Sequence, residues 1–138
     1  MNEIIVQKFG GTSVGSVERI DAVAEIIKKA SESKKIIVVV SAMGGETNRL
    51  VDLAKHFDAD PNKREFDALI STGEKVSASL LAMALNSLGL KAKSYSAAQV
   101  SLKTTSNFSK AKILDIDKTK MEEILADDAI PIITGFQG

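Results

Sequence analysis

The chain has no cysteine and only one histidine among its 138 residues. The absence of cysteine excludes disulfides, cysteine-ligated zinc and a thiol nucleophile. A chain without cysteine suits a reducing compartment, so we expect a cytoplasmic protein. His56 lies between charged and apolar neighbours in an expected helix, and we interpret it as a surface or half-buried residue, not as a catalytic base.

A net charge of either sign is also missing, because 18 basic residues balance 18 acidic ones. No strong positive field is available to attract nucleic acid or an anionic membrane. The longest apolar run, Ile36 to Val40, is too short to span a bilayer. Met1 leads directly into an expected strand without a basic region or a long apolar segment, so we predict no signal peptide. We therefore expect neither a nucleic-acid partner nor a membrane partner.

Hydrophobic residues make up 44% of the chain and charged residues 26%, which is typical of one soluble domain. Apolar periodicity predicts strands that alternate with helices, and this order favours an α/β fold. We expect a three-layer αβα sandwich with a mainly parallel sheet. The expected strands cover residues 4–7, 36–40, 91–96, 112–116 and 129–135, and residues 101–110 are expected to form a loop.

Capping residues predict where the helices begin and end. Ser16 is expected to cap the first helix, and Asp60 with Pro61 to open another. Ser71–Gly73 is expected to interrupt that helix before a long one that ends at Gly89. Thr119 with Glu122 predicts a capping box for a last helix that ends near residue 127.

Three expected strands end in segments rich in glycine, serine and threonine: residues 8–13, 41–45 and 134–138. In open α/β sheets, ligands bind outside the carboxyl ends of the strands, so these segments predict a ligand crevice. Glycine loops that lead into helix N-termini favour anions, and Lys8 could add a full positive charge. The first loop is neither a P-loop nor a GxGxxG motif. These residues favour a phosphate site.

Each candidate residue also has a simpler explanation. Lys8 could be a solvated lysine at a strand end, and Ser41 could merely close a strand. Thr47 could be an N-cap, and Glu74 could compensate a helix dipole. Asp115 and Asp117 lie two residues apart without further acidic or histidine partners, so we predict no metal site.

The motifs resemble those of aspartate kinases in the amino acid kinase superfamily. The resemblance rests on Lys8 to Ser13, on Ser41 to Gly44 followed by Thr47, on Arg64 to Glu74, and on Gly135 to Gly138. It covers nearly the whole chain in order, which is more specific than any one motif. It implies an amino acid kinase fold and corresponds to the N-terminal part of the catalytic domain.

The resemblance implies ATP-dependent phosphorylation of the β-carboxylate of L-aspartate, the first step toward lysine, threonine and methionine. It assigns the phosphates of ATP to Lys8, Phe9, Gly10, Gly11, Thr12 and Ser13, with Lys8 at the transferred phosphoryl group. It assigns L-aspartate to Ser41, Thr47 and Glu74, with Glu74 pairing the α-ammonium group. It further implies ATP with Mg²⁺ as co-substrate, no covalently bound cofactor, and a homo-oligomer.

The sequence departs from the family pattern in two places. Val100-Ser101-Leu102 stands where the family has glycine, so no role is transferred to that loop. The segment that completes the aspartate clamp, the half that holds the nucleoside of ATP, and the ACT regulatory domains are missing. Residues 1–138 are therefore expected to form the substrate-side lobe alone and to be inactive by themselves.

Two alternatives remain open from the sequence. The chain could come from another kinase of this fold, such as a glutamate, acetylglutamate or uridylate kinase, although the first loop argues against that. It could also be a non-catalytic binding or interaction domain that has kept the fold. A truncated parallel sheet would then leave an open edge and uncovered apolar surface.

Overall fold

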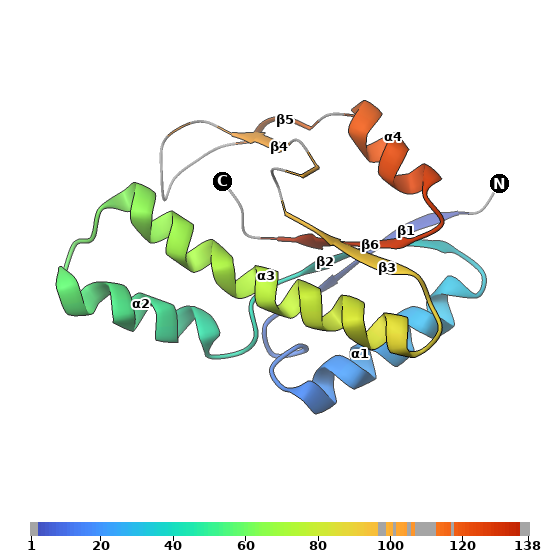
Figure 1. Ribbon diagram of the computed structural model, residues 1–138, viewed down its shortest axis with the longest axis horizontal. Coiled ribbons are helices and arrows are strands. Elements are labelled where there is room, and N and C mark those ends of the chain that lie inside the picture. The colour runs from blue at the N-terminus through green and yellow to red at the C-terminus, as the bar shows by residue number, and fades with distance from the viewer. Residues whose placement is uncertain are drawn as a thin grey trace.

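The computed structural model describes residues 3–96, 99–100, 102–104, 106, 113–116 and 118–135. Strands and helices alternate along most of the chain (Figure 1). In order they are β1 (Ile4–Phe9), α1 (Val17–Ser31), β2 (Lys35–Val40), α2 (Glu46–Phe57), α3 (Lys63–Ser87), β3 (Ala92–Tyr95), β4 (Leu102–Thr104), β5 (Ile113–Ile116), α4 (Lys118–Ala126) and β6 (Ile130–Thr134).

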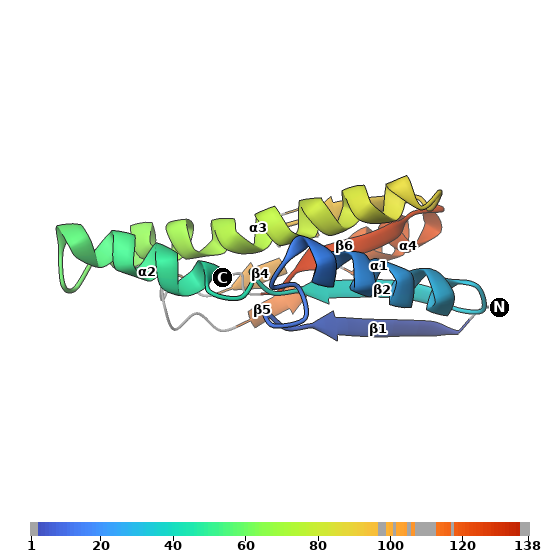
Figure 2. The ribbon, with the colours of Figure 1, turned by 90° about the horizontal axis from the view of Figure 1, so that it is seen from below.

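The main sheet has four strands in the order β1-β2-β6-β3, and every neighbouring pair is parallel. Helices α1 and α3 cover one face, and α4 lies across the other face with the small antiparallel β4–β5 pair (Figures 1 and 2). The predicted α/β fold with a parallel sheet is confirmed. All parallel strands point their carboxyl ends to the same edge, which is where the candidate residues gather.

The core lies between β2 and the helices α1 and α3. Ile36, Val38 and Val40 of β2 are at most 1% exposed, and they face Ile27 of α1 and Leu81 of α3, which are fully buried. A central parallel strand is covered on both faces, so its sequence is a continuous apolar run instead of an alternating one.

The structure confirms the predicted helix ends at Ser16 and Gly89 and contradicts the one at Asp60 and Pro61. Ser16 caps α1, because its hydroxyl oxygen accepts a hydrogen bond from the Arg19 N–H at 3.2 Å. Gly89 follows α3 with φ at 88°, in the left-handed region that glycine adopts without strain. The prediction for Asp60 and Pro61 is wrong. Asn62 is the N-cap of α3, and its side-chain oxygen accepts a hydrogen bond from the Glu65 N–H at 3.1 Å.

The expected break at Ser71–Gly73 does not exist, and α3 runs unbroken for 25 residues. Ser71 and Thr72 turn their hydroxyls back onto backbone carbonyl oxygens three residues earlier, at 3.0 and 2.6 Å. Such bonds let hydroxyl side chains remain inside a helix. Gly73 is there for a packing reason, since a Cβ on it would lie 3.0 Å from the Cβ of Ala42.

Two expectations near the end of the chain are also wrong. Residues 102–104 form β4, which pairs with β5, although we expected a loop throughout residues 101–110. Thr119 lies inside α4, which already begins at Lys118, so it is not an N-cap. Residues 101, 117 and 136–138 lie outside the described part of the chain. The expectations for Ser101, for Asp117 and for the end of the last glycine-rich segment therefore stay predictions.

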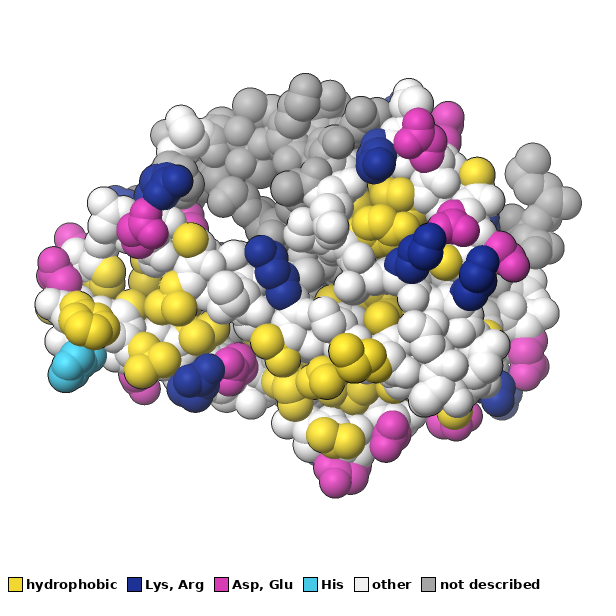
Figure 3. Space-filling view, viewed as in Figure 1, with side chains coloured by type: hydrophobic (Ala, Val, Ile, Leu, Met, Phe, Trp, Pro, Cys, Tyr) yellow, Lys and Arg dark blue, Asp and Glu magenta, His cyan; other side chains and the backbone are white. Residues whose placement is uncertain are grey.

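Helix α3 is long and apolar enough to cross a membrane by length and composition alone. Its buried residues, among them Leu81 and Leu85, pack into the core of this domain. The outer side of α3 exposes Val76 and Met83, and Figure 3 shows apolar side chains over α2 and the middle of α3.

The contact at Gly73 leads to a stability prediction. At an exposed helix position, alanine normally makes the helix more stable than glycine does, by up to about 1 kcal/mol. We expect Gly73→Ala instead to lower the free energy of unfolding by about 1 kcal/mol, because overpacking against Ala42 outweighs that gain. Urea unfolding followed by circular dichroism measures the change.

Gly10→Ala is the matched control. It adds the same methyl group at a position where nothing lies within 4 Å. We expect it to change the free energy of unfolding by less than about 0.5 kcal/mol. A Gly73→Ala protein as stable as the wild type would contradict the packing argument.

Candidate functional site

A cleft opens at the carboxyl end of β2, between the N-terminus of α2 and the middle of α3. Its volume is about 490 Å³, which is within the usual range for sites that bind small molecules. Four segments line it: Gly11, the Ser41–Gly45 loop, Thr47 and Val51 of α2, and Phe66, Asp67, Ile70 and Glu74 of α3. The cleft therefore lies at the sheet edge that the strand ends predict.

Two glycine-rich loops pack against each other beside this cleft. A Cβ on Gly11 would lie 3.0 Å from the Ala42 carbonyl oxygen, and one on Gly44 would lie 3.3 Å from the Gly11 carbonyl oxygen. Because the obstructing atoms belong to the backbone, side chains at these positions would push the loops apart. Gly11 is the residue of the first loop that reaches the cleft.

Glu74 places a carboxylate at the base of the cleft. The residue is only 4% exposed, and Gly135 lies beside it, since a Cβ on Gly135 would be 3.8 Å from Glu74 Oε1. Asp67 lines the cleft seven residues earlier on the same face of α3. Among the residues that the structure describes, the lining contains two carboxylates and no lysine or arginine, so it suits a positively charged group such as an ammonium.

Ser41 and Thr47 contribute hydroxyl groups near the start of α2. The N-cap of α2 is Gly45, with φ at 85°, so the alternative that Thr47 is the N-cap is wrong. Thr47 is the second residue of α2 and lines the cleft. The first turn of a helix carries N–H groups without intrahelical partners and a partial positive charge, which favour a carboxylate or phosphate. The cleft thus combines an acidic side with a side that favours anions.

Ser77 fastens α3 to the end of β2. Its side chain is fully buried, and its hydroxyl oxygen lies 2.5 Å from the Ser41 carbonyl oxygen and 3.1 Å from the Glu74 carbonyl oxygen. One hydroxyl therefore touches the backbone of two cleft residues that lie 33 positions apart. It fixes the spacing between Ser41 and Glu74.

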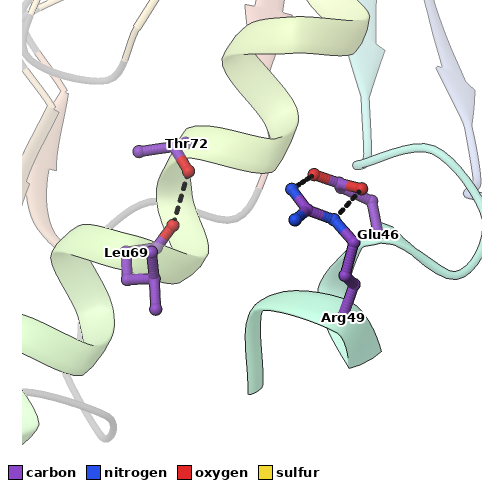
Figure 4. A network of polar contacts seen from close by, with 4 residues as sticks. All are labelled: Glu46, Arg49, Leu69 and Thr72. Carbon is purple, nitrogen blue, oxygen red and sulfur yellow. Dashed lines mark hydrogen bonds and ion pairs between the residues drawn. The ribbon is translucent and has the colours of Figure 1, made fainter. Parts of the chain in front are cut away.

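Glu46 and Arg49 form a bidentate pair in the first turn of α2. Arg49 Nε and Nη2 donate to the two carboxylate oxygens of Glu46 at 3.0 and 2.7 Å (Figure 4). The hydrogen bonds from Arg49 lower the pKa of the Glu46 carboxyl. Figure 4 shows the pair beside the turn of α3 in which Thr72 donates to the Leu69 carbonyl. Neither Glu46 nor Arg49 lines the cleft.

The structure brings some of the candidate residues together and leaves others apart. Gly11 and Ser41 line one cleft, as the strand ends predict, and Thr47 of α2 and Glu74 of α3, which the resemblance added, line it too. Lys8 is exposed at the end of β1 and is not among the lining residues. The remaining residues of the first loop, namely Phe9, Gly10, Thr12 and Ser13, do not line it either.

The first loop has two structural features of its own. Phe9 packs its side chain against the core, and its carbonyl oxygen accepts a hydrogen bond from the Ser41 N–H at 3.1 Å. The loop then turns tightly, with the Ser13 N–H donating to the Gly10 carbonyl oxygen at 3.0 Å. Any contact of Phe9 with a phosphate would therefore involve its backbone.

Sequence reasoning missed Asp67 and Ser77 as site residues. Asp67, Ile70 and Glu74 have the i, i+3, i+7 spacing of one helix face, which was hidden by the expected break at residues 71–73. Ser77 carries no signal of its own, because its importance depends on the approach of β2 to α3.

Comparison with known proteins extends this description. Residues 3–138 match the model of the Amino acid kinase family. The chain is 52% identical to the aspartate kinase of Pseudomonas putida over 136 residues and 50% identical to the aspartokinase of Geobacillus stearothermophilus. Each match covers 98% of this chain and 33% of the relative. The chain thus spans about a third of the length of these curated relatives.

Solved structures give the same result for the fold. The aspartate kinase from Synechocystis superposes with a TM-score of 0.85 at 46% identity, covering 98% of this chain and 22% of that one. Aspartokinase III of E. coli, in complex with aspartate and ADP, superposes with a TM-score of 0.77. Its identity is 23%, and the match covers 97% of this chain and 41% of that one, so it supports the fold alone.

The position of Ser77 leads to a second stability prediction. We expect Ser77→Ala to lower the free energy of unfolding by about 1–3 kcal/mol, because it removes a buried hydrogen bond between α3 and the end of β2. Ser87→Ala is the control, since Ser87 also bonds to a carbonyl three residues earlier, but at the exposed end of the same helix. Equal effects in urea unfolding would contradict the special role of Ser77.

Proposed function

The chain belongs to the amino acid kinase family, and from this premise we propose that it is the N-terminal, substrate-side part of an aspartate kinase. The complete enzyme would transfer the γ-phosphoryl group of ATP to the β-carboxylate of L-aspartate, giving 4-phospho-L-aspartate. The observation that carries the proposal is the cleft in which buried Glu74 shares one space with Ser41, Thr47 and the start of α2. Such a cleft suits a zwitterionic amino acid.

The substrate would lie with its α-ammonium group against Glu74. A buried ammonium needs a carboxylate partner, and Asp67 adds negative charge to the same wall. The Ser41 and Thr47 hydroxyls and the first turn of α2 would donate hydrogen bonds to carboxylate oxygens of L-aspartate. The segment that completes this clamp would come from the rest of the enzyme.

The phosphates of ATP would bind at the first loop. Lys8 would neutralise charge on the transferred phosphoryl group, and the N–H groups of Gly10 and Gly11 would hold phosphate oxygens. The packing of Gly11 against Ala42 supports this placement, because it brings the loop to the wall of the cleft. The nucleoside would be held by a part of the enzyme outside this chain.

Catalysis would consist mainly of positioning and charge neutralisation. A side-chain carboxylate with a pKa near 4 is ionised at neutral pH, so it can attack phosphorus without a general base. The described residues contain no group of three or more His, Asp or Glu side chains that could hold a metal. Magnesium would arrive on the phosphates of ATP and would neutralise part of their negative charge.

The proposal also covers the pathway, the cellular compartment and the assembly of the enzyme. The reaction would be the first step toward lysine, threonine and methionine, in the cytoplasm, and the enzyme would be a homo-oligomer. The similarity to aspartate kinases at about half identity over nearly the whole chain supports the reaction.

Substrate binding tests the role of Glu74. We expect the chain to bind L-aspartate, and Glu74→Gln to weaken that binding at least about tenfold through loss of the ammonium's charged partner. Titrations of the ¹⁵N-labelled chain by NMR give the dissociation constants. Glu65→Gln is the control, because Glu65 lies on the same helix with its side chain 68% exposed.

Glutamate and uridine monophosphate belong in the same titration series. Tighter binding of either would favour another kinase of this fold and would contradict the assignment to aspartate. Equal aspartate binding by Glu74→Gln and the wild type would show that Glu74 is not the ammonium partner.

Turnover tests the division of the site between two parts. In a coupled assay of ADP release, we expect no aspartate-dependent activity from the 138-residue chain and clear activity from the longer protein that contains it. Lys8→Met in that longer protein should lower kcat by at least about a hundredfold, as expected when a cation at the transferred phosphoryl group is lost. Robust turnover by the chain alone would contradict the proposed division.

A further inference from the structure

A second hollow, separate from the cleft, lies between α3 and the carboxyl ends of β3 and β6. Its volume is about 330 Å³. Polar side chains dominate its lining, which includes Lys75, Ser79, Ser94, Ser96, Gln99 and Thr134. It shares no lining residue with the cleft at Glu74. Aspartate and ATP phosphates, as proposed above, therefore leave this hollow unassigned.

The two hollows have opposite charge. Among the described residues that line the second hollow, Lys75 carries a charge and none is a carboxylate, whereas the cleft is lined by Glu74 and Asp67. Glu74 and Lys75 are adjacent on α3, and successive helical residues point about 100° apart. The helix thus directs a negative side chain into one space and a positive side chain into the other.

Thr134 provides an independent sign of a ligand. The residue is 4% exposed, and among the described residues its side-chain oxygen has no hydrogen-bond partner. Buried hydroxyl groups are nearly always hydrogen-bonded, so one that lines a polar hollow without a partner is suited to bind what enters it.

Gln99 also lines this hollow, and hydrogen bonds to Ser96 hold it in place. Its side-chain carbonyl oxygen accepts a hydrogen bond from the Ser96 N–H at 2.8 Å, and its own N–H lies 3.4 Å from the Ser96 hydroxyl oxygen. The carbonyl end of the amide is therefore occupied, which leaves the NH₂ end to donate. Together with the serine hydroxyls, these groups surround the hollow with potential donors.

We propose that this hollow binds a small oxyanion, namely the carboxylate or phosphate group of a free metabolite. Lys75 supplies the positive charge, and Thr134 and Gln99 donate hydrogen bonds. The proposal does not depend on the kinase function, because it uses none of the residues assigned to aspartate or to ATP.

Titration of the ¹⁵N-labelled chain with inorganic phosphate and, separately, with acetate tests the proposal at constant ionic strength. We expect saturable shifts of the amide signals of Ser94, Ser96, Gln99 and Thr134 with at least one of the two anions. The anion that binds more tightly identifies the group. Absence of saturable shifts with both, or shifts centred on the Gly10–Ser13 loop instead, would overturn the proposal.

Two variants separate a binding role from a structural one. Lys75→Gln should weaken anion binding about tenfold or more. Lys29→Gln, at an exposed position on α1, should leave the affinity for the anion unchanged. Thr134→Val should weaken anion binding and leave the melting temperature equal or higher. The reason is that the Thr134 hydroxyl has no protein partner to lose among the described residues. Unchanged anion affinity in Lys75→Gln would overturn the proposal.

Aspartate titrations of the same samples keep the two proposals apart. Glu74→Gln should lose aspartate binding and keep anion binding. Lys75→Gln should keep aspartate binding and lose anion binding. A wild-type chain that binds the anion but not aspartate would contradict the proposed kinase function and leave the anion site supported.

Discussion

The site depends on the close approach of α3 to the carboxyl end of β2. Gly73 lets the helix come within van der Waals distance of Ala42, and the Ser77 hydroxyl touches the Ser41 carbonyl oxygen. This contact sets where Glu74 lies relative to Ser41, and it forms the wall against which α2 and the first glycine loop pack. A glycine and a serine of one helix therefore control the geometry of residues that come from four separate segments.

Much of the fold could be predicted because its signals are local. Each signal predicts the structure of the segment in which it occurs. The continuous β-branched run at residues 36–40 predicts a buried strand, Ser16 predicts a helix start, and Gly89 predicts a helix end. The gathering of Gly11 and Ser41 followed from one topological rule about parallel strand ends, whereas Thr47 and Glu74 were selected by the resemblance to aspartate kinases. These predictions did not require knowledge of the packing.

The errors arise where packing overrides local preference. Ser71, Thr72 and Gly73 disfavour a helix on their own, yet two of them bond back to the helix and the third allows the contact with Ala42. That one wrong boundary also hid Asp67, which shares a face with Glu74 only if α3 is continuous. The strand β4 forms because it pairs with β5, and such a short strand carries little signal in its own sequence.

The position of β6 in the sheet has a consequence for how the chain folds as it is synthesised. β6 lies between β2 and β3, although both of these strands are made before it, and among the described strands only β6 joins β2 to β3. One of the two inner strands of the sheet is thus absent until residues 130–134 have left the ribosome. Long-range parallel pairing of this kind folds slowly and leaves apolar edges uncovered in the meantime. The second hollow also needs Thr134 at the end of β6, so it cannot be complete in a nascent chain that stops before this residue.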